Sequence, residues 1–257
     1  MPKLYYVIKA EKSGVLATIE VNGVPVLLWR SANHVSTTDQ LNAWALPGEN
    51  ELRIKIEWPE DEDFSPGKAS LELSMEALQV GQKLGTTRPL LEFKWPPKNP
   101  DEEQYPYEAT LKFNVSDPPP SDFWPNARKI HFTDRTREEI VAQLKELHAA
   151  MKARDIDRVA KFFEFKAVDV RKAHYIDPAD AQADLREYLE FFLTEESWDL
   201  PDLDPDALEF HVLAGNRVVW VTEPDYRNPI RTKDGASPGI QIPLYYGQTD
   251  NEWKIVR

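Results

Sequence analysis

Short segments in which apolar and polar residues alternate fill the first half of the chain. In ELRIKIEW (residues 51–58) every second residue from Leu52 to Trp58 is apolar, and the residues between them are charged. This pattern is typical of a strand with one buried face, because successive side chains of a strand point to opposite sides of the sheet. The same alternation recurs in residues 17–21, 71–77 and 107–115. Several short strands without a helical period predict an all-β sandwich.

In the second half, apolar residues recur at steps of three and four, which is the spacing of one helical face. The first predicted helix has the apolar face Ile140, Leu144, Leu147 and Met151. Thr136 and Glu139 are expected to form a capping box at its start. A short second helix is expected after Asp155, and a third begins at Asp177 and Pro178. The third helix is predicted to bury the stripe Leu185, Tyr188, Leu189 and Phe192.

Strands are predicted around and after the third helix. The segment KAVDVRKAHY (residues 166–175) alternates loosely and is interpreted as a strand between the second and third helices. Further antiparallel strands are predicted at residues 207–213, 217–223, 240–247 and 252–257. The second half is therefore expected to be an α+β domain.

A proline-rich segment separates the two halves. Three successive prolines occur in SDPPPSDFWPNARK (residues 116–129), and they hold the chain extended and remove backbone donors. We therefore expect a sandwich domain at residues 1–117, a linker at 118–129 and an α+β domain at 130–257. The earlier proline-rich stretch at residues 95–106 is interpreted as a loop of the sandwich, because a predicted strand follows it.

Two motifs of the first half resemble the galactose-binding-like and jelly-roll β-sandwich modules. These are VNGVPV (residues 21–26), which holds a hairpin turn, and ALPGENELRIKI (residues 45–56), which holds a turn before a strand. The resemblance implies a sandwich fold and offers carbohydrate binding as one function. Trp29 and Trp44 are the candidates for a sugar platform, with burial in the core as the alternative.

The second half resembles the NTF2-like family, the cystatin-related α+β cone. The resemblance lies in the order helix, helix, strand, helix and then antiparallel strands that end in the W-K-I strand of residues 253–255. It implies a curved antiparallel sheet that encloses a pocket with the helices. The family includes small-molecule enzymes, ligand-binding proteins, association modules and bacterial toxin-immunity proteins.

Composition narrows the classes of partner. The 257-residue chain has a formal net charge of −13, and a direct nucleic-acid partner is not expected because phosphate binding needs concentrated Lys and Arg. The chain has no Cys, so disulfides and thiolate metal sites are excluded. No apolar run has the length of a signal peptide core or a membrane span. We expect a cytoplasmic bacterial protein without a membrane partner.

Motifs for metal or nucleophilic chemistry are missing from the sequence. The five His show no HxH, HxxH or HExxH spacing. Asp202, Asp204 and Asp206 alternate as in a calcium loop, but Ala207 and Leu213 stand where an EF-hand needs Gly and Glu. Neither a phosphate-binding glycine loop nor a GxSxG elbow occurs. No metal, cofactor or catalytic residue is expected.

A pocket of the cone is the alternative site. Its candidate lining residues are His174, Tyr175, Tyr188, His211, Trp220 and Tyr245. A His beside a carboxylate in such a pocket can move a proton. Alternation places His211 on the side of its strand opposite Phe210 and Val212, so His211 faces away from the pocket if those two face into it. Asp177 has a sufficient structural role as the cap of its helix.

The segment EESWDLPDLDPDALEF (residues 195–210) has seven carboxylates and no basic residue. Apolar residues between acids are typical of a protein interface, in which the charges steer encounter and the apolar groups anchor the partner. The candidate partner-binding residues are Trp198, Asp199, Asp202, Asp204, Asp206 and Glu209. The alternative is that the apolar residues pack inside the protein while the acids are solvated.

These patterns favour a non-enzymatic, acidic protein-binding module. Its partner is expected to be a basic protein, as for an immunity-type inhibitor of a bacterial toxin such as a nuclease. The alternatives are an NTF2-like enzyme or small-ligand binder that uses the cone pocket, and carbohydrate binding by the sandwich. A homodimer formed through the C-terminal domain is a further expectation.

Overall fold

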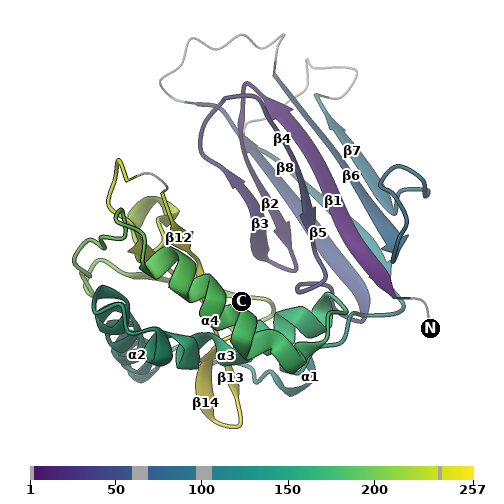
Figure 1. Cartoon of the computed structure of the whole chain (residues 1–257). Coiled ribbons are helices and arrows are strands. Elements are labelled where there is room, and N and C mark those ends of the chain that lie inside the picture. Colours follow the sequence, from purple (N-terminus) through teal and green to yellow (C-terminus); the bar gives the residue numbers. More distant parts are fainter. Residues whose placement is uncertain (1–2, 60–68, 97–105, 237–238) are drawn as a thin grey trace. The chain divides into compact units, whose positions relative to one another are not determined.

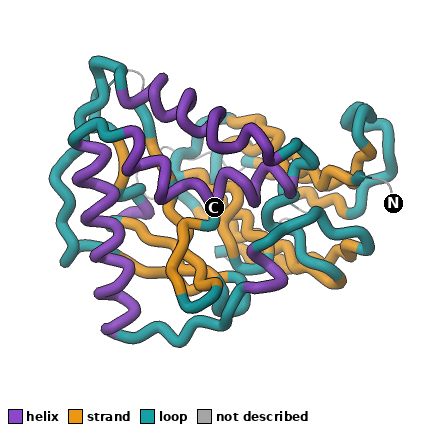
Figure 2. Tube along the Cα trace, turned by 60° about the horizontal axis from the view of Figure 1, so that its bottom comes forward, coloured by secondary structure: helices purple, strands orange, loops and turns teal. Residues whose placement is uncertain are grey.

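The computed structural model describes residues 3–59, 69–96, 106–236 and 239–257. The chain forms two compact units, Met1–Pro119 and Pro120–Arg257. Among the described residues, strands and loops build the first unit, and every helix belongs to the second (Figure 1, Figure 2).

The first unit consists of two four-stranded antiparallel sheets, with strand orders β4-β1-β6-β7 and β3-β2-β5-β8. The strands are β1 (Leu4–Ser13), β2 (Leu16–Val21), β3 (Val24–Trp29), β4 (Val35–Gln40), β5 (Gly48–Glu57), β6 (Ser70–Gln79), β7 (Leu91–Trp95) and β8 (Tyr107–Val115). The hairpin between β2 and β3 turns at Asn22 and Gly23, which both have positive φ as a two-residue hairpin requires. Residues 97–105 of the loop expected between β7 and β8 lie outside the described residues.

One hydrophobic core is shared by the two sheets of the first unit. Ile54 of β5 and Ile8 of β1 are fully buried in it, and so is Leu71 of β6. The alternation predicted for residues 51–58 is confirmed, because Arg53 is exposed between its two buried neighbours. Trp29 and Trp44 are partly buried and pack against this core.

The second unit combines helices with an antiparallel sheet of order β14-β13-β10-β9. Its helices are α1 (Phe123–Asn126), α2 (Asp134–Lys152), α3 (Ile156–Ala173) and α4 (Ala181–Leu193), with 3-10 helices at Pro178–Asp180 and Pro224–Tyr226. Its strands are β9 (Glu209–Leu213), β10 (Val218–Thr222), β11 (Ile230–Arg231), β12 (Gln241–Ile242), β13 (Leu244–Thr249) and β14 (Glu252–Ile255), of which β11 and β12 pair separately.

The helices α2, α3 and α4 share a core with one face of the four-stranded sheet. The apolar face predicted for α2 is confirmed, since Ile140 and Leu144 are fully buried with Val219 and Val221 of β10. The predicted cap of α2 is wrong by one turn. Thr133 is the N-cap, and its side chain accepts a hydrogen bond from the amide of Thr136.

The strand predicted at residues 166–175 is wrong, because α3 runs without interruption from Ile156 to Ala173. Asp155 caps its start as expected, through a hydrogen bond from the amide of Arg158. Asp169 and Ala173 are buried one turn apart, which is a helical rather than a strand spacing. No Gly or Pro interrupts this stretch, and its Lys, Arg and Ala favour a helix. The element order that suggested an NTF2-like cone is therefore not met in this segment.

Candidate functional site

The acidic segment, residues 195–209, follows α4 and ends at the first residue of β9, and it keeps its large apolar side chains inside. Trp198 is only 4% exposed, Leu200 2% and Leu208 6%. The indole Nε1 of Trp198 donates a hydrogen bond of 3.1 Å to the carbonyl of Met151 at the end of α2. Trp198 was expected to anchor a partner, but it is a core residue that holds the acidic segment to the protein.

Basic side chains from distant parts of the chain pair with two of the middle acids of this segment. Lys233 contacts Asp199 at 2.6 Å, and Lys152 of α2 contacts Asp202 at 2.5 Å. The hydrogen bond from Lys152 holds the pKa of the Asp202 carboxyl below its usual value. These pairs cannot be recognised from the residues around the acids, because the two members of each pair are 34 and 50 positions apart in the chain.

The later acids of the acidic segment remain exposed. The carboxylate of Asp204 accepts a hydrogen bond of 3.0 Å from the amide of Asp206. Within the described part of the chain, neither residue has an ion-pair partner. Glu209 is exposed at the start of β9 and lies 3.8 Å from the Nε2 of His211. Asp204, Asp206 and Glu209 therefore present negative charge to solvent.

Helix α4 exposes two aromatic side chains. Tyr188 is 63% exposed and Phe191 is 68% exposed, and their spacing of three residues places them side by side on the helix. The stripe predicted for α4 is therefore correct for Leu189 and Phe192, which are buried, and wrong for Tyr188.

Carboxylates surround this aromatic pair, because Glu187 and Glu190 are also exposed on α4. Neither of these two carboxylates has an ion-pair partner among the described residues. The exposed face of α4 is therefore both apolar and acidic.

A series of aromatic contacts connects α4 to the acidic segment. The ring of Tyr188 meets that of Phe192 edge-on at a centroid distance of 4.9 Å. Phe192 in turn contacts Trp198, with centroids 5.2 Å apart. His148 of α2 adds a 2.9 Å hydrogen bond to the carbonyl of Pro201. Helix α4 and the acidic segment are therefore packed on one another through these side chains. The exposed residues of the two elements are here together called the acidic face.

A cavity of about 410 Å³ lies between α3, α4 and the chain before β13. Its wall is mainly apolar and includes Val170 of α3 and Leu185 of α4. Tyr188 also lines this cavity, so one of the six candidate pocket residues is placed in a pocket. The sequence did not single out Lys166, which lines the wall from a stretch that was interpreted as a strand.

Three other pocket candidates meet on the sheet surface that faces away from α2, α3 and α4. Trp220 of β10 stacks on Tyr245 of β13, with centroids 5.7 Å apart and ring planes at 18°. The ring of His211 lies 5.2 Å from that of Trp220 and stacks on Tyr226 at 5.4 Å. The expectation that His211 faces opposite Phe210 is confirmed, since Phe210 packs against the helical core.

This aromatic group does not form an acid-base pair. The Nε2 of His211 is 2.9 Å from the hydroxyl of Thr222 and 3.8 Å from the carboxylate of Glu209. Burial lowers the pKa of His211, and the charge of Glu209 opposes this only in part. The imidazole is therefore held neutral, without a carboxylate at hydrogen-bond distance.

His174 and Tyr175 lie at the end of α3, where the chain leaves the helix. His174 is the C-cap of α3, and Tyr175 has a φ of 57°, a left-handed conformation typical of a helix end. Neither residue lines the cavity between α3 and α4. The six pocket candidates therefore fall into three separate places.

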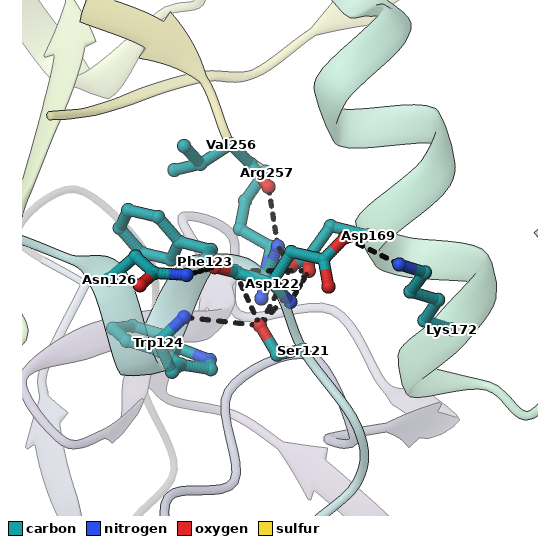
Figure 3. Close-up of polar contacts among 9 residues, drawn as sticks. All are labelled: Ser121, Asp122, Phe123, Trp124, Asn126, Asp169, Lys172, Val256 and Arg257. Atoms are coloured by element: carbon teal, nitrogen blue, oxygen red, sulfur yellow. Dashed lines mark hydrogen bonds and ion pairs between the residues drawn. The ribbon is translucent and has the colours of Figure 1, made fainter. Parts of the chain in front are cut away.

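A buried polar cluster around Asp169 of α3 connects this helix to the start of α1 and to Arg257, which follows β14 (Figure 3). Its carboxylate forms an ion pair of 2.6 Å with Arg257 and accepts a 2.9 Å hydrogen bond from the hydroxyl of Ser121. The amides of Asp122 and Phe123 also donate to it. The side chains of Asp169 and Arg257 are at most 3% exposed. The cluster therefore has a structural role.

Within the described residues, no three His, Asp or Glu side chains come together as a metal-binding group. None of the helices described has the length and apolar composition that crossing a bilayer requires. Comparison of the chain with protein-family models, with curated proteins and with solved structures finds no match.

Proposed function

We propose that this protein is a non-enzymatic protein-binding module that binds a basic partner protein through its acidic face. The observation that carries the proposal is the exposure of Tyr188 and Phe191 on α4 among unpaired carboxylates. Single exposed apolar residues are common on soluble proteins. Two adjacent exposed aromatic side chains are less common, and aromatic residues are among those that contribute most of the binding energy in protein interfaces.

The carboxylates determine which partners fit this face. Glu187 and Glu190 flank the aromatic pair, and Asp204 and Asp206 extend the negative charge along the acidic segment. Such a field attracts a positively charged partner and accelerates its encounter. A second copy of this chain is a poor partner for the acidic face, because two such faces repel. The expected homodimer would need another surface.

The aromatic series explains how the acidic face keeps its shape. Trp198 and Phe192 are buried beneath it, so the exposed side chains are supported by the core rather than carried on a loose loop. A preorganised surface binds with a smaller loss of conformational entropy than a flexible one. Trp198 thus contributes to binding by support, without contact to the partner.

An inhibitor that covers a basic bacterial toxin, such as a nuclease, is the most specific form of the proposal, and it includes a cytoplasmic location. The three helices followed by an antiparallel sheet favour a relation to NTF2-like proteins, whereas the continuous helix α3 departs from that pattern. The two sheets with one core in the first unit favour a jelly-roll-like sandwich.

The proposal is tested by capture from an extract of the native cell with immobilised protein. The wild-type protein should retain one or more basic proteins, and the double variant Tyr188→Ala/Phe191→Ala should lose them. We expect each substitution to cost about 2 kcal/mol, or roughly thirtyfold in Kd. Ile176→Ala is the matched control, because Ile176 is 49% exposed but lies outside α4.

The charges are tested separately on the purified partner. The double variant Glu187→Gln/Glu190→Gln should slow association several-fold at low salt and flatten its salt dependence, since exposed charges act mainly on the association rate. Equal retention of every captured protein by the wild type and the aromatic double variant would contradict the proposed site.

A further inference from the structure

The cavity between α3 and α4 has the size and lining of a small-molecule site. A volume of about 410 Å³ falls within the range in which proteins hold small ligands. Phe163 and Val170 of α3, Leu185 of α4 and Ile242 of β12 supply much of its apolar wall. Only four polar or charged residues interrupt the rest of the lining, namely Lys166, Arg171, Asp184 and Gln241.

Three of these groups carry charge, and two of them neutralise each other. The guanidinium of Arg171 pairs with the carboxylate of Asp184 and also donates a 2.8 Å hydrogen bond to the carbonyl of Asp177. Lys166 has no ion-pair partner in the described part of the chain, and its Nζ lies 5.8 Å from the centre of the Phe163 ring. Lys166 is therefore the cation of the cavity wall that lacks a counterion.

The surroundings of Lys166 do not supply a counterion. The carboxylate of Asp169, one turn further along α3, is occupied by Arg257 and by the start of α1. Burial, with a smaller effect of the positive charge of Arg257, lowers the pKa of Lys166 to about 8. An ammonium group in such a place is stabilised by any carboxylate that reaches it.

We propose that this cavity binds a small amphipathic carboxylate, with its apolar body between α3 and α4 and its carboxylate on the ammonium of Lys166. The apolar wall accepts a hydrocarbon or aromatic body, and the unpaired cation selects the charge of the head group. This site is distinct from the exposed acidic face, although Tyr188 borders both.

Decanoate is a suitable probe, with decanol as the uncharged compound of equal chain length. Isothermal titration calorimetry at pH 7 should show saturable binding of decanoate by the full chain, more than about tenfold tighter than that of decanol. A tenfold ratio of the two dissociation constants is the size of effect that a hydrogen bond between charged groups contributes. An absence of saturable decanoate binding, or equal affinity for the two compounds, overturns the proposal.

Substitutions assign the head group to Lys166. Lys166→Met keeps the length and apolar stem of the side chain, so it should preserve the fold by circular dichroism and reduce decanoate binding to the level of decanol. Lys166→Arg should restore most of the affinity. Lys161→Met is the matched control, since Lys161 is exposed on the same helix and does not line this cavity.

The dependence on pH gives an independent measurement. The tighter binding of decanoate requires the protonated amine, so the affinity of the wild type should be greatest below the pKa of Lys166 in the unliganded protein. Above that value, near 8, it should fall by at most about tenfold for each pH unit, until it reaches the level of decanol. Lys166→Arg should remove this decline. An affinity for decanoate that does not change between pH 7 and 9.5, or undiminished binding by Lys166→Met, contradicts the assignment.

Discussion

At the scale of single residues, the ion pair of Asp169 and Arg257 is the most deeply buried ion pair among the described residues. Burial lowers the pKa of Arg257, and the charge of Asp169 opposes this effect. The carboxylate is further compensated by the hydroxyl of Ser121 and by amides at the start of α1 (Figure 3). Removal of one partner would leave the other charged, buried and uncompensated.

Asp169→Ala should therefore lower the free energy of unfolding by about 3–5 kcal/mol. Urea denaturation followed by circular dichroism measures this loss. Lys172→Ala is the control, because Lys172 forms a partly exposed pair with Asp122 next to the same cluster. That pair should be worth at most about 1 kcal/mol. Similar losses for both variants would show that burial does not determine the contribution of Asp169.

His211 should make stability depend on pH. Its folded-state pKa lies below the usual 6.5, so the unfolded chain binds the proton more readily. The free energy of unfolding should therefore decline as the pH falls through 6.5 toward the folded-state pKa, and this effect should be absent above 6.5. His211→Phe preserves an aromatic ring beside Trp220 and Tyr226 and should reduce the decline, as measured by urea denaturation at pH 7, 6 and 5. Identical declines for both proteins would be inconsistent with a lowered pKa of the half-buried imidazole.

At the scale of elements, a close approach joins α1 to the C-terminal sheet. Gly247 of β13 faces the ring of Phe123, and a Cβ at this glycine would lie 2.6 Å from the Cζ of Phe123 and 3.1 Å from Val256. Because Phe123 is fully buried, its ring has little room to move. The absence of a side chain at Gly247 thus allows α1 to pack on the sheet.

Gly247→Ala should overpack this contact and lower the free energy of unfolding by about 1–3 kcal/mol. Gly239→Ala is the matched control, since among the described residues a Cβ there would meet only the carbonyl of Ala236, at an ordinary 3.6 Å. Thermal unfolding of both variants measures the difference. A Gly247→Ala protein as stable as the control would show that α1 shifts without cost.

At the scale of the whole molecule, two units with separate cores carry a strongly negative charge. Charge of this size favours solubility by itself, so net charge alone does not identify an interface. What distinguishes the second unit is the combination of charge with exposed aromatic rings on α4. The same unit also holds the cavity with Lys166, which makes its helices the part of the molecule richest in candidate sites.

Features that depend on local periodicity could be predicted from the sequence. The alternation in β5 and the helical spacing in α2 each predicted the correct buried face, because the pleat of a strand and the turn of a helix set the direction of every side chain. The boundaries were less accurate where a cap was ambiguous, as for Thr133 and Thr136. A loose alternation in residues 166–175 also fitted a strand, although α3 continues through them.

The packing of the acidic segment and the positions of the pocket residues could not be predicted from local patterns. Trp198 is buried and Tyr188 exposed because of how α4 and the acidic segment pack on α2, and no local pattern records that packing. Lys152 and Lys233 reach the acids from distant positions in the chain. The physical reason is that charge pairing, cavity formation and the exposure of a side chain are properties of surfaces that meet in space, whereas hydrophobic periodicity is a property of neighbours along the chain.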